Sequence, residues 1–430
     1  MSVNNYIKAD KYCLRVTDGT HDSPSQTKSG KRLITSRHLK QFSLDFDNAY
    51  LISLEDYNDI IKRSKVDKWD ILISMIGTVG LIYQEKSEKI DYAIKNIGLF
   101  KLGGDQLKSK WLYYYLQTPD AIEYIVKFKR GSTQQYLPLN TLRSFPIRVL
   151  PYEVQYHITS VLSSLDDKIE LNNRMNKTLE EIAQTLFKRW FVDFEFPDEN
   201  GNPYKSSGGK MVESELGSIP KGWNVVSIKE LIEDYIGGDW GKDKPTEEFS
   251  TPMSCIRGAD FPAVQSGNIS DLPLRYVKES SMHRRRLENE DIVLEISGGT
   301  KGRPVGRTVY INHALITKLD YPVSFSNFCR LVRCKRPFGL MVYQYIQMKY
   351  FDGEIEQYQL QSTGIANFQF NSFLENFKII SSNVKTAYQF SNIAGPLFER
   401  LQMNDSKILS QIRDTLLPKL MSGEIRVTDN

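Results

Sequence analysis

Three short stretches of the sequence resemble catalytic or ligand-binding motifs, and each lacks a part that its chemistry requires. Asp166-Asp167-Lys168 offers two carboxylates and a cation, as in a nuclease metal site, but no Pro-Asp partner precedes it at a useful distance. Asn202-Pro203-Tyr204 resembles part of the Asn-Pro-Pro-aromatic motif of amino-methyltransferases, but the second proline is missing. SGGTKGRPVGR (297–307) could cradle phosphate through backbone N–H groups, but it is not followed by Gly-Lys-Ser/Thr. We therefore predict no catalytic site, no metal site and no cofactor.

The cysteines give no further reactive site. The chain has 430 residues and four cysteines, which are too few and too scattered to form a disulfide framework. Cys329 and Cys334 lie within a predicted strand and its exit. We interpret them as buried free thiols rather than as metal ligands.

Several loops carry side chains that suit contacts to nucleic acid. Arginine and lysine can reach phosphates and guanine acceptors, glutamine and asparagine can pair with adenine, and Ser and Thr can serve either role. Taken alone, polar loops of this kind are more often solvated surface than binding sites. The predicted organisation of the whole chain nevertheless favours contact with nucleic acid. The candidates in the first half of the chain are Thr20, His21, Lys31, Arg32, Arg37, Thr78, Lys129, Arg130, Ser132, Thr133, Gln134 and Gln135. Those in the second half are Trp240, Lys242, Arg285, Thr300, Lys301, Arg303, Ser362, Thr363 and Asn367.

Two long amphipathic helices are predicted to hold these loops in place. Apolar residues recur at helical spacing from Pro151 to Phe196 and again from Ala387 to Leu420. A helix of roughly 35 residues is on the order of 50 Å long, which is too long for one compact domain. We therefore expect the two helices to pack against each other.

The chain is a tandem repeat of long period. Leu179, Ile182 and Leu186 match Leu409, Ile412 and Leu416 at a constant offset, and KRGST (129–133) matches QLQST (359–363) at the same offset. WDILIS (69–74) likewise matches EDIVLE (290–295), and a glycine-containing loop follows each of them. Each half is therefore predicted to be a globular α/β module followed by one long helix.

Over essentially its full length, the sequence resembles the specificity subunits of type I restriction-modification systems. The most specific strings are DDKIELNNRMNKTLEEIAQTLFKRWFVDFE (166–195), ELGSIPKGW (215–223) and LLPKLMSGEIRV (416–427). The resemblance implies an α/β (α+β) fold: two globular target-recognition domains in tandem repeat, separated by two long antiparallel coiled-coil helices. We predict target-recognition domain 1 at 1–150, the central helix at 151–197, a linker and target-recognition domain 2 at 198–383, and a C-terminal long helix at 384–430.

The same resemblance implies a function and partners. The expected function is that of a non-catalytic DNA-binding subunit, which reads an asymmetric bipartite target and positions the other subunits of a methyltransferase/endonuclease complex. The expected partners are double-stranded DNA, two methyltransferase (modification) subunits and the restriction/translocase subunits. Within the long helix, Asp166 and Asp167 are interpreted either as a solvated face or as polar residues that fix helix register.

Composition agrees with this interpretation. Residues 1–150 hold 23 Lys+Arg against 16 Asp+Glu, whereas residues 151–200 hold 5 against 10. The first module could therefore favour phosphate, and the acidic helix more plausibly faces protein. Module two (201–383) holds 22 Lys+Arg against 21 Asp+Glu, so the prediction that it binds DNA depends on local basic patches rather than on its net charge. No apolar run is long enough to span a membrane and the N-terminus has no signal core, so a cytoplasmic location is expected.

Three alternatives remain open at this stage. The chain could be a nuclease or methyltransferase with an unfamiliar site, and the purified chain alone would then cut or methylate DNA. It could be a coiled-coil scaffold for protein partners, although the duplicated polar loops argue against that. It could also be the DNA-binding specificity subunit of another modification or defence system.

Overall fold

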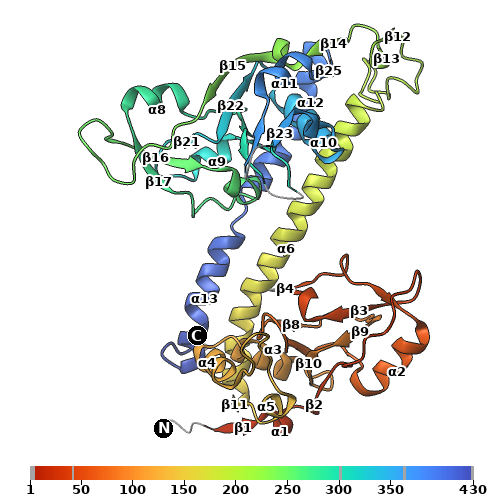
Figure 1. Cartoon of the computed structure of the whole chain (residues 1–430), viewed down its shortest axis with the longest axis vertical. Coiled ribbons are helices and arrows are strands. Elements are labelled where there is room, and N and C mark those ends of the chain that lie inside the picture. The colour runs from red at the N-terminus through yellow and green to blue at the C-terminus, as the bar shows by residue number, and fades with distance from the viewer. Residues whose placement is uncertain (1–4, 41–42, 300–302, 362–364, 428–430) are drawn as a thin grey trace. The chain divides into compact units, whose positions relative to one another are not determined.

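The computed structural model describes residues 5–40, 43–299, 303–361 and 365–427. The chain forms two compact units (Figure 1). Unit 1 consists of residues 1–168 and 409–430, and unit 2 consists of residues 169–408. The boundary falls within the central helix α6 (Tyr152–Phe191), so each unit contains one part of that helix.

Unit 1 is built on a four-stranded antiparallel sheet and a smaller mixed sheet. The first has the order β2 (Arg15–Asp18), β10 (Ile97–Lys101), β7 (Ile71–Ser74), β8 (Ile82–Gln84). The second has the order β6 (Leu51–Ile52), β3 (Lys31–Thr35), β9 (Tyr92–Lys95), with β3 parallel to β9. Two-stranded ribbons pair β1 (Tyr6–Lys8) with β11 (Pro146–Arg148) and β4 (Leu39–Lys40) with β5 (Ser43–Leu44). The helices are α1 (Ala9–Tyr12), α2 (Leu54–Ser64), α3 (Gln106–Tyr115), α4 (Pro119–Phe128) and α5 (Leu139–Arg143).

Unit 2 repeats this topology. Its four-stranded sheet has the order β15 (Ile232–Gly237), β22 (Cys329–Cys334), β18 (Ile292–Glu295), β20 (Thr308–Tyr310). Its mixed sheet has the order β17 (Leu274–Val277), β16 (Thr251–Ile256), β21 (Val323–Phe325), again with one parallel pair. The ribbon β14 (Asn224–Ser227) with β25 (Lys378–Ser381) corresponds to β1 with β11, while β12 (Met211–Ser214) and β13 (Gly217–Pro220) pair within the stretch that joins α6 to β14. The helices are α7 (Phe261–Gln265), α8 (Glu279–Arg285), α9 (His313–Thr317), α10 (Gly339–Phe351) and α11 (Phe370–Asn376). The structure therefore confirms the tandem repeat.

In each unit, a buried aspartate immediately precedes a central strand of the four-stranded sheet. Asp70 precedes β7 and accepts hydrogen bonds from the backbone N–H of Asp67 (2.8 Å) and from Lys101 Nζ (2.8 Å). Asp291 precedes β18 and accepts from the backbone N–H of Glu288 (2.6 Å) and from Arg333 Nε (2.8 Å). Burial raises the pKa of both carboxyl groups, and the lysine or arginine partner opposes that shift. The repeat is thus preserved in the buried polar contacts as well as in the strand order.

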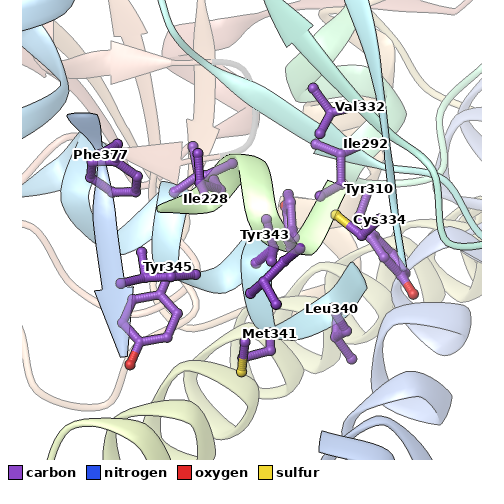
Figure 2. Close-up of a cluster of buried hydrophobic side chains, with 14 of the residues drawn as sticks. Ile228, Ile292, Tyr310, Val332, Cys334, Leu340, Met341, Tyr343, Tyr345 and Phe377 are labelled. Atoms are coloured by element: carbon purple, nitrogen blue, oxygen red, sulfur yellow. The ribbon is translucent and has the colours of Figure 1, made fainter. Parts of the chain in front are cut away.

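A large aromatic and aliphatic core fills unit 2. Figure 2 shows Leu340, Met341, Tyr343 and Tyr345 of α10 within this cluster, together with residues of the sheet such as Ile292 and Val332. The ring of Phe390, on α12 (Val384–Gln402), lies 4.9 Å from that of Phe191 on α6. The crowded aromatic residues at the end of the central helix are therefore core residues of unit 2.

The long helices pair in antiparallel fashion within each unit. In unit 2 the Phe187 and Phe390 rings are 6.1 Å apart, and Asn176 Nδ2 lies 3.5 Å from the Leu401 carbonyl oxygen. Residue numbers therefore increase along α6 in the direction in which they decrease along α12. In unit 1, residues of the first turns of α6 share one core with the last turns of α13 (Ser406–Ser422).

The C-terminal helix is interrupted, which corrects the prediction of one continuous helix. Within the described residues it consists of α12 and α13, separated by Met403, Asn404 and Asp405. Asn404 Oδ1 accepts a hydrogen bond from the backbone N–H of Ser406 (2.9 Å). Asparagine and aspartate favour such side-chain bonds to nearby backbone N–H groups over the interior of a helix. The apolar repeat continues across the break, which explains why periodicity alone did not reveal it.

Candidate nucleic-acid interface

The loops predicted to contact nucleic acid leave the same end of the four-stranded sheet in unit 1. Asp18, the last residue of β2, pairs with Gly98 of β10, and Ser74, the last residue of β7, pairs with Ile97 of β10. The loop after Asp18, the turn before Ile97 and the loop after Ser74 therefore begin side by side. We call this end of the sheet the loop edge of unit 1.

The segment 129–136 extends that edge. Arg130 and Tyr136 exchange backbone hydrogen bonds (2.9 and 2.8 Å), which closes a hairpin around Ser132, Thr133, Gln134 and Gln135. The hairpin pairs in turn with the loop that contains Thr78, because Ile76 bridges to Tyr136 and the Gly77 N–H donates to the Gln135 carbonyl (3.2 Å). Thr78 and residues 130–136 are exposed. Two segments that are far apart in the sequence are thus joined into one exposed surface.

Unit 2 builds the same edge from different residues. Gly237, the last residue of β15, pairs with Arg330 of β22, and Glu295, the last residue of β18, pairs with Cys329. The following loop forms β19 (Ser297–Gly298), which pairs with β24 (Ala366–Phe368), and β24 pairs with β23 (Gln359–Gln361). Asn367 is exposed here, and its Oδ1 accepts a hydrogen bond from Ser297 Oγ (2.9 Å). Arg303 is exposed near the end of the same loop.

The first loop of unit 1 is held by an arginine that sequence reasoning missed. Arg63 Nη2 donates to the Asp18 carboxylate (2.6 Å), to the Asp18 carbonyl (3.2 Å) and to the Gly19 carbonyl (2.9 Å). His21 is exposed, with Nε2 lying 3.0 Å from Asp18 Oδ2 and Nδ1 lying 2.9 Å from Asn96 Oδ1. Thr20 joins the same loop through a backbone bridge to Lys95. The loop that carries Thr20 and His21 is therefore held at the loop edge, and their contact with DNA stays a prediction.

Three predicted residues of unit 1 lie along β3 and the turn that follows it. The last residue of β3, Thr35, pairs with Lys95, and Ser36 Oγ donates to the Asn96 carbonyl (2.8 Å), so the exposed Arg37 lies close to the loop edge. Lys31 and Arg32 begin the strand and so lie at its far end. Lys31 pairs with Asp91 (3.4 Å), and Arg32 Nε donates to the Phe46 carbonyl (3.2 Å). The structure does not bring these two residues together with the rest.

In unit 2 two predicted contact residues, Trp240 and Arg285, make intramolecular contacts. The guanidinium of Arg275 lies 4.1 Å from the ring centroid of Trp240, so one face of the indole is already covered. Arg285 Nε donates to the Gly237 carbonyl (2.8 Å), and its Nη1 donates to Ser281 Oγ (3.0 Å). Arg285 thus holds the first loop of unit 2 much as Arg63 holds that of unit 1.

The remaining predicted residues lie either at the protein surface, fully or partly exposed, or outside the described residues. Lys242 is exposed, with its ammonium 5.4 Å from the Phe249 ring, and Lys129 is half-buried at the base of its hairpin. Thr300, Lys301, Ser362 and Thr363 lie outside the described residues.

The residues at the loop edges that were not predicted from the sequence are Arg63, Asn96 and Phe328. Asn96 has a positive φ of 55°, a conformation that asparagine tolerates better than most residues.

Within the described residues, no group of three or more His, Cys, Asp or Glu side chains could hold a metal ion. Asp166, which in sequence resembled part of a nuclease site, is a seam residue: its Oδ1 accepts from Arg413 Nη1 (2.6 Å) and its Oδ2 from the Tyr114 hydroxyl (2.6 Å). All four cysteines are free and buried, which confirms the interpretation of Cys329 and Cys334 as buried free thiols. In the described part of the chain, no helix combines the length and apolarity needed to cross a membrane.

Comparison with known proteins supports one family. A model described as the type I restriction modification DNA specificity domain matches residues 27–181. The chain is 28% identical over 338 residues to the type I restriction enzyme MjaIX specificity subunit of Methanocaldococcus jannaschii, covering 76% of this chain and 71% of that protein. It is 24% identical over 357 residues to the HindI specificity subunit of Haemophilus influenzae, covering 74% and 77%.

The fold has a solved counterpart. The crystal structure of the type I restriction-modification S subunit from M. genitalium aligns with a TM-score of 0.58 and 14% identity, over 100% of this chain and 99% of that one. At this level of identity the comparison supports the architecture of two repeated domains with long helices.

Proposed function

Because the chain belongs to the type I restriction-modification specificity subunits, which recognise DNA targets, we propose that it reads an asymmetric bipartite sequence, one half-site for each unit. It would position two methyltransferase subunits and the restriction/translocase subunits of a cytoplasmic complex. It would perform neither methylation nor cleavage itself.

One observation carries the proposal. The two units share one topology and one kind of loop edge, but the side chains on the two edges differ. A repeat that keeps its scaffold and changes its exposed loop residues is suited to reading two different sequences, because specificity resides in hydrogen bonds and apolar contacts to base edges. The long helices would then set the distance between the half-sites, since the separation of recognition elements determines half-site spacing on a duplex.

The first experiment maps methylated adenines in DNA from cells that express this chain with its methyltransferase subunit, and in parallel from cells that express either protein alone. We expect a single split motif that appears only when both proteins are present. Methylation by this chain alone would mean that it is an enzyme. No new methylation with a methyltransferase shown to be active would contradict the proposal.

The role of the hairpin in unit 1 can be tested with two variants. Gln134→Ala should relax the requirement for one base pair, at a cost of about 1–3 kcal/mol in discrimination, because a glutamine amide can pair with adenine. Lys129→Ala should weaken binding to all sequences and reduce the salt dependence of the binding constant by about one phosphate contact. If both variants bind the mapped target with unchanged affinity, salt dependence and base preference, then the hairpin does not contact DNA.

A further inference from the structure

The loop edge of unit 2 exposes apolar side chains, although its surroundings are polar. Phe328 is 50% exposed, Leu360 is 56% exposed and Ile365 is 45% exposed. All three belong to the segments that form the edge. The Phe328 carbonyl accepts hydrogen bonds from the backbone N–H groups of Ile296 (2.9 Å) and Ser297 (3.3 Å), which fixes its backbone beside β19.

Leu360 projects from the exposed face of the small sheet β19-β24-β23. Leu360 pairs with Asn367, and Asn367 pairs with Ser297, so these three side chains project on the same side. Ile365 immediately precedes β24. The opposite face, with Ala366 and Phe368, is buried. The exposed face thus presents the aliphatic side chain of Leu360 beside the carboxamide of Asn367.

The repeat shows which residue of unit 1 corresponds to Phe328. Ile97 pairs with the last residue of β7, and Cys329 pairs with the last residue of β18, so the residues that precede them, Asn96 and Phe328, are equivalent. Unit 1 therefore has a carboxamide where unit 2 has a phenyl ring. Each hairpin also exposes large apolar residues: Tyr136 in unit 1, and Leu360 and Ile365 among the described residues of unit 2. The difference between the two edges that strand register establishes is therefore the one between Asn96 and Phe328.

An apolar side chain can recognise one feature of a base pair in the major groove, the C5-methyl group of thymine. We propose that Phe328, half-exposed at the loop edge of unit 2, contacts a thymine methyl group in the half-site read by unit 2. This inference depends on the proposed function, and it specifies the chemistry by which that half-site is read.

The experiment uses the complete complex with its methyltransferase subunits, after the target has been mapped. Each thymine of the two half-sites is replaced in turn by deoxyuridine, which removes only the methyl group, and the affinity for each duplex is measured. One deoxyuridine position should weaken binding about fourfold, the effect expected for one buried methyl group. Phe328→Ala should weaken binding to the unmodified target and abolish the difference between thymine and deoxyuridine at that position only.

Two further variants make the result specific. Phe328→Leu keeps an apolar contact and should retain sensitivity to deoxyuridine. Tyr321→Ala removes another exposed aromatic residue of unit 2, 42% exposed, which precedes β21 and so lies at the opposite end of that strand from Phe328. It should leave both the affinity and the deoxyuridine effect unchanged.

The proposal is overturned if no deoxyuridine substitution weakens binding, or if the effect has the same size in the wild type and in Phe328→Ala. It is also overturned if the coupled thymines occur in both half-sites. A wild-type complex that methylates without any sequence preference would instead refute the proposed function, so the two failures are distinguishable.

Discussion

The helix seam of unit 1 contains a buried ion pair whose loss should be measurable. Arg413 on α13 is 1% exposed, and its Nη1 lies 2.6 Å from Oδ1 of Asp166 on α6. The second carboxylate oxygen of Asp166 accepts from the Tyr114 hydroxyl at 2.6 Å. The Asp166 carboxylate therefore connects α6 with both α13 and α3.

Asp166→Ala should destabilise unit 1 by about 3 kcal/mol. Removing one partner from a buried pair typically costs about 3–5 kcal/mol, because the other charge remains buried without compensation. We expect the lower end of that range because Asp414 also pairs with Arg413 at 2.7 Å and is largely exposed. For a unit of this size the loss corresponds to a fall in Tm on the order of 10 °C. Alanine favours helix, so helix propensity does not contribute to the loss.

The neighbouring residue provides a matched control. Asp167 lies on the same helix, is largely exposed and pairs with Lys86 at 3.6 Å. Asp167→Ala should cost less than about 1 kcal/mol, as is usual for exposed pairs. Hydrogen exchange of peptides from α3 and α13, measured by mass spectrometry on the full chain, reports the stability of unit 1 separately from that of unit 2.

A second substitution tests the physical reason. Adding Arg413→Met to Asp166→Ala removes the buried charge that has lost its Asp166 partner and should restore part of the lost stability, because apolar residues can replace a buried pair at little cost. If Asp166→Ala and Asp167→Ala lower protection in unit 1 equally, or if Arg413→Met makes the loss greater, then the pair does not stabilise the seam as argued.

Two further predictions follow from buried contacts. Burial raises the pKa of Cys13, Cys255 and Cys329 to about 12, so these thiols stay protonated at pH 8 and should react with a thiol reagent only as fast as the chain unfolds; fast labelling of the native protein would contradict this. Gly238→Ala should cost about 1–3 kcal/mol and disturb the first loop of unit 2, because the added Cβ would lie 2.0 Å from the Ser326 carbonyl oxygen, whereas Gly237→Ala meets no atom within 4 Å; equal melting temperatures for the two variants would show that the loop shifts without cost.

The sequence by itself determined the scaffold. Apolar residues at helical spacing predicted both long helical regions, and the constant offset between Leu179 and Leu409 or Ser132 and Ser362 predicted the tandem repeat that the strand orders confirm. These signals are local and repeated, so they can be recognised without knowledge of which segments meet. The break at Asn404 escaped because the apolar stripe continues on both sides of it.

Only the tertiary structure decided which polar residues share an edge. Lys31 and Arg37 looked equivalent in the sequence, but strand pairing places Lys31 at the far end of β3 and Arg37 beside the loop edge. The sequence did not show that Arg285 donates hydrogen bonds to the Gly237 carbonyl and to Ser281 Oγ. The equivalence of Asn96 and Phe328 follows from strand register alone. Register and side-chain partners depend on residues far apart in the chain, and polar loop residues carry no periodic pattern from which those partners could be read.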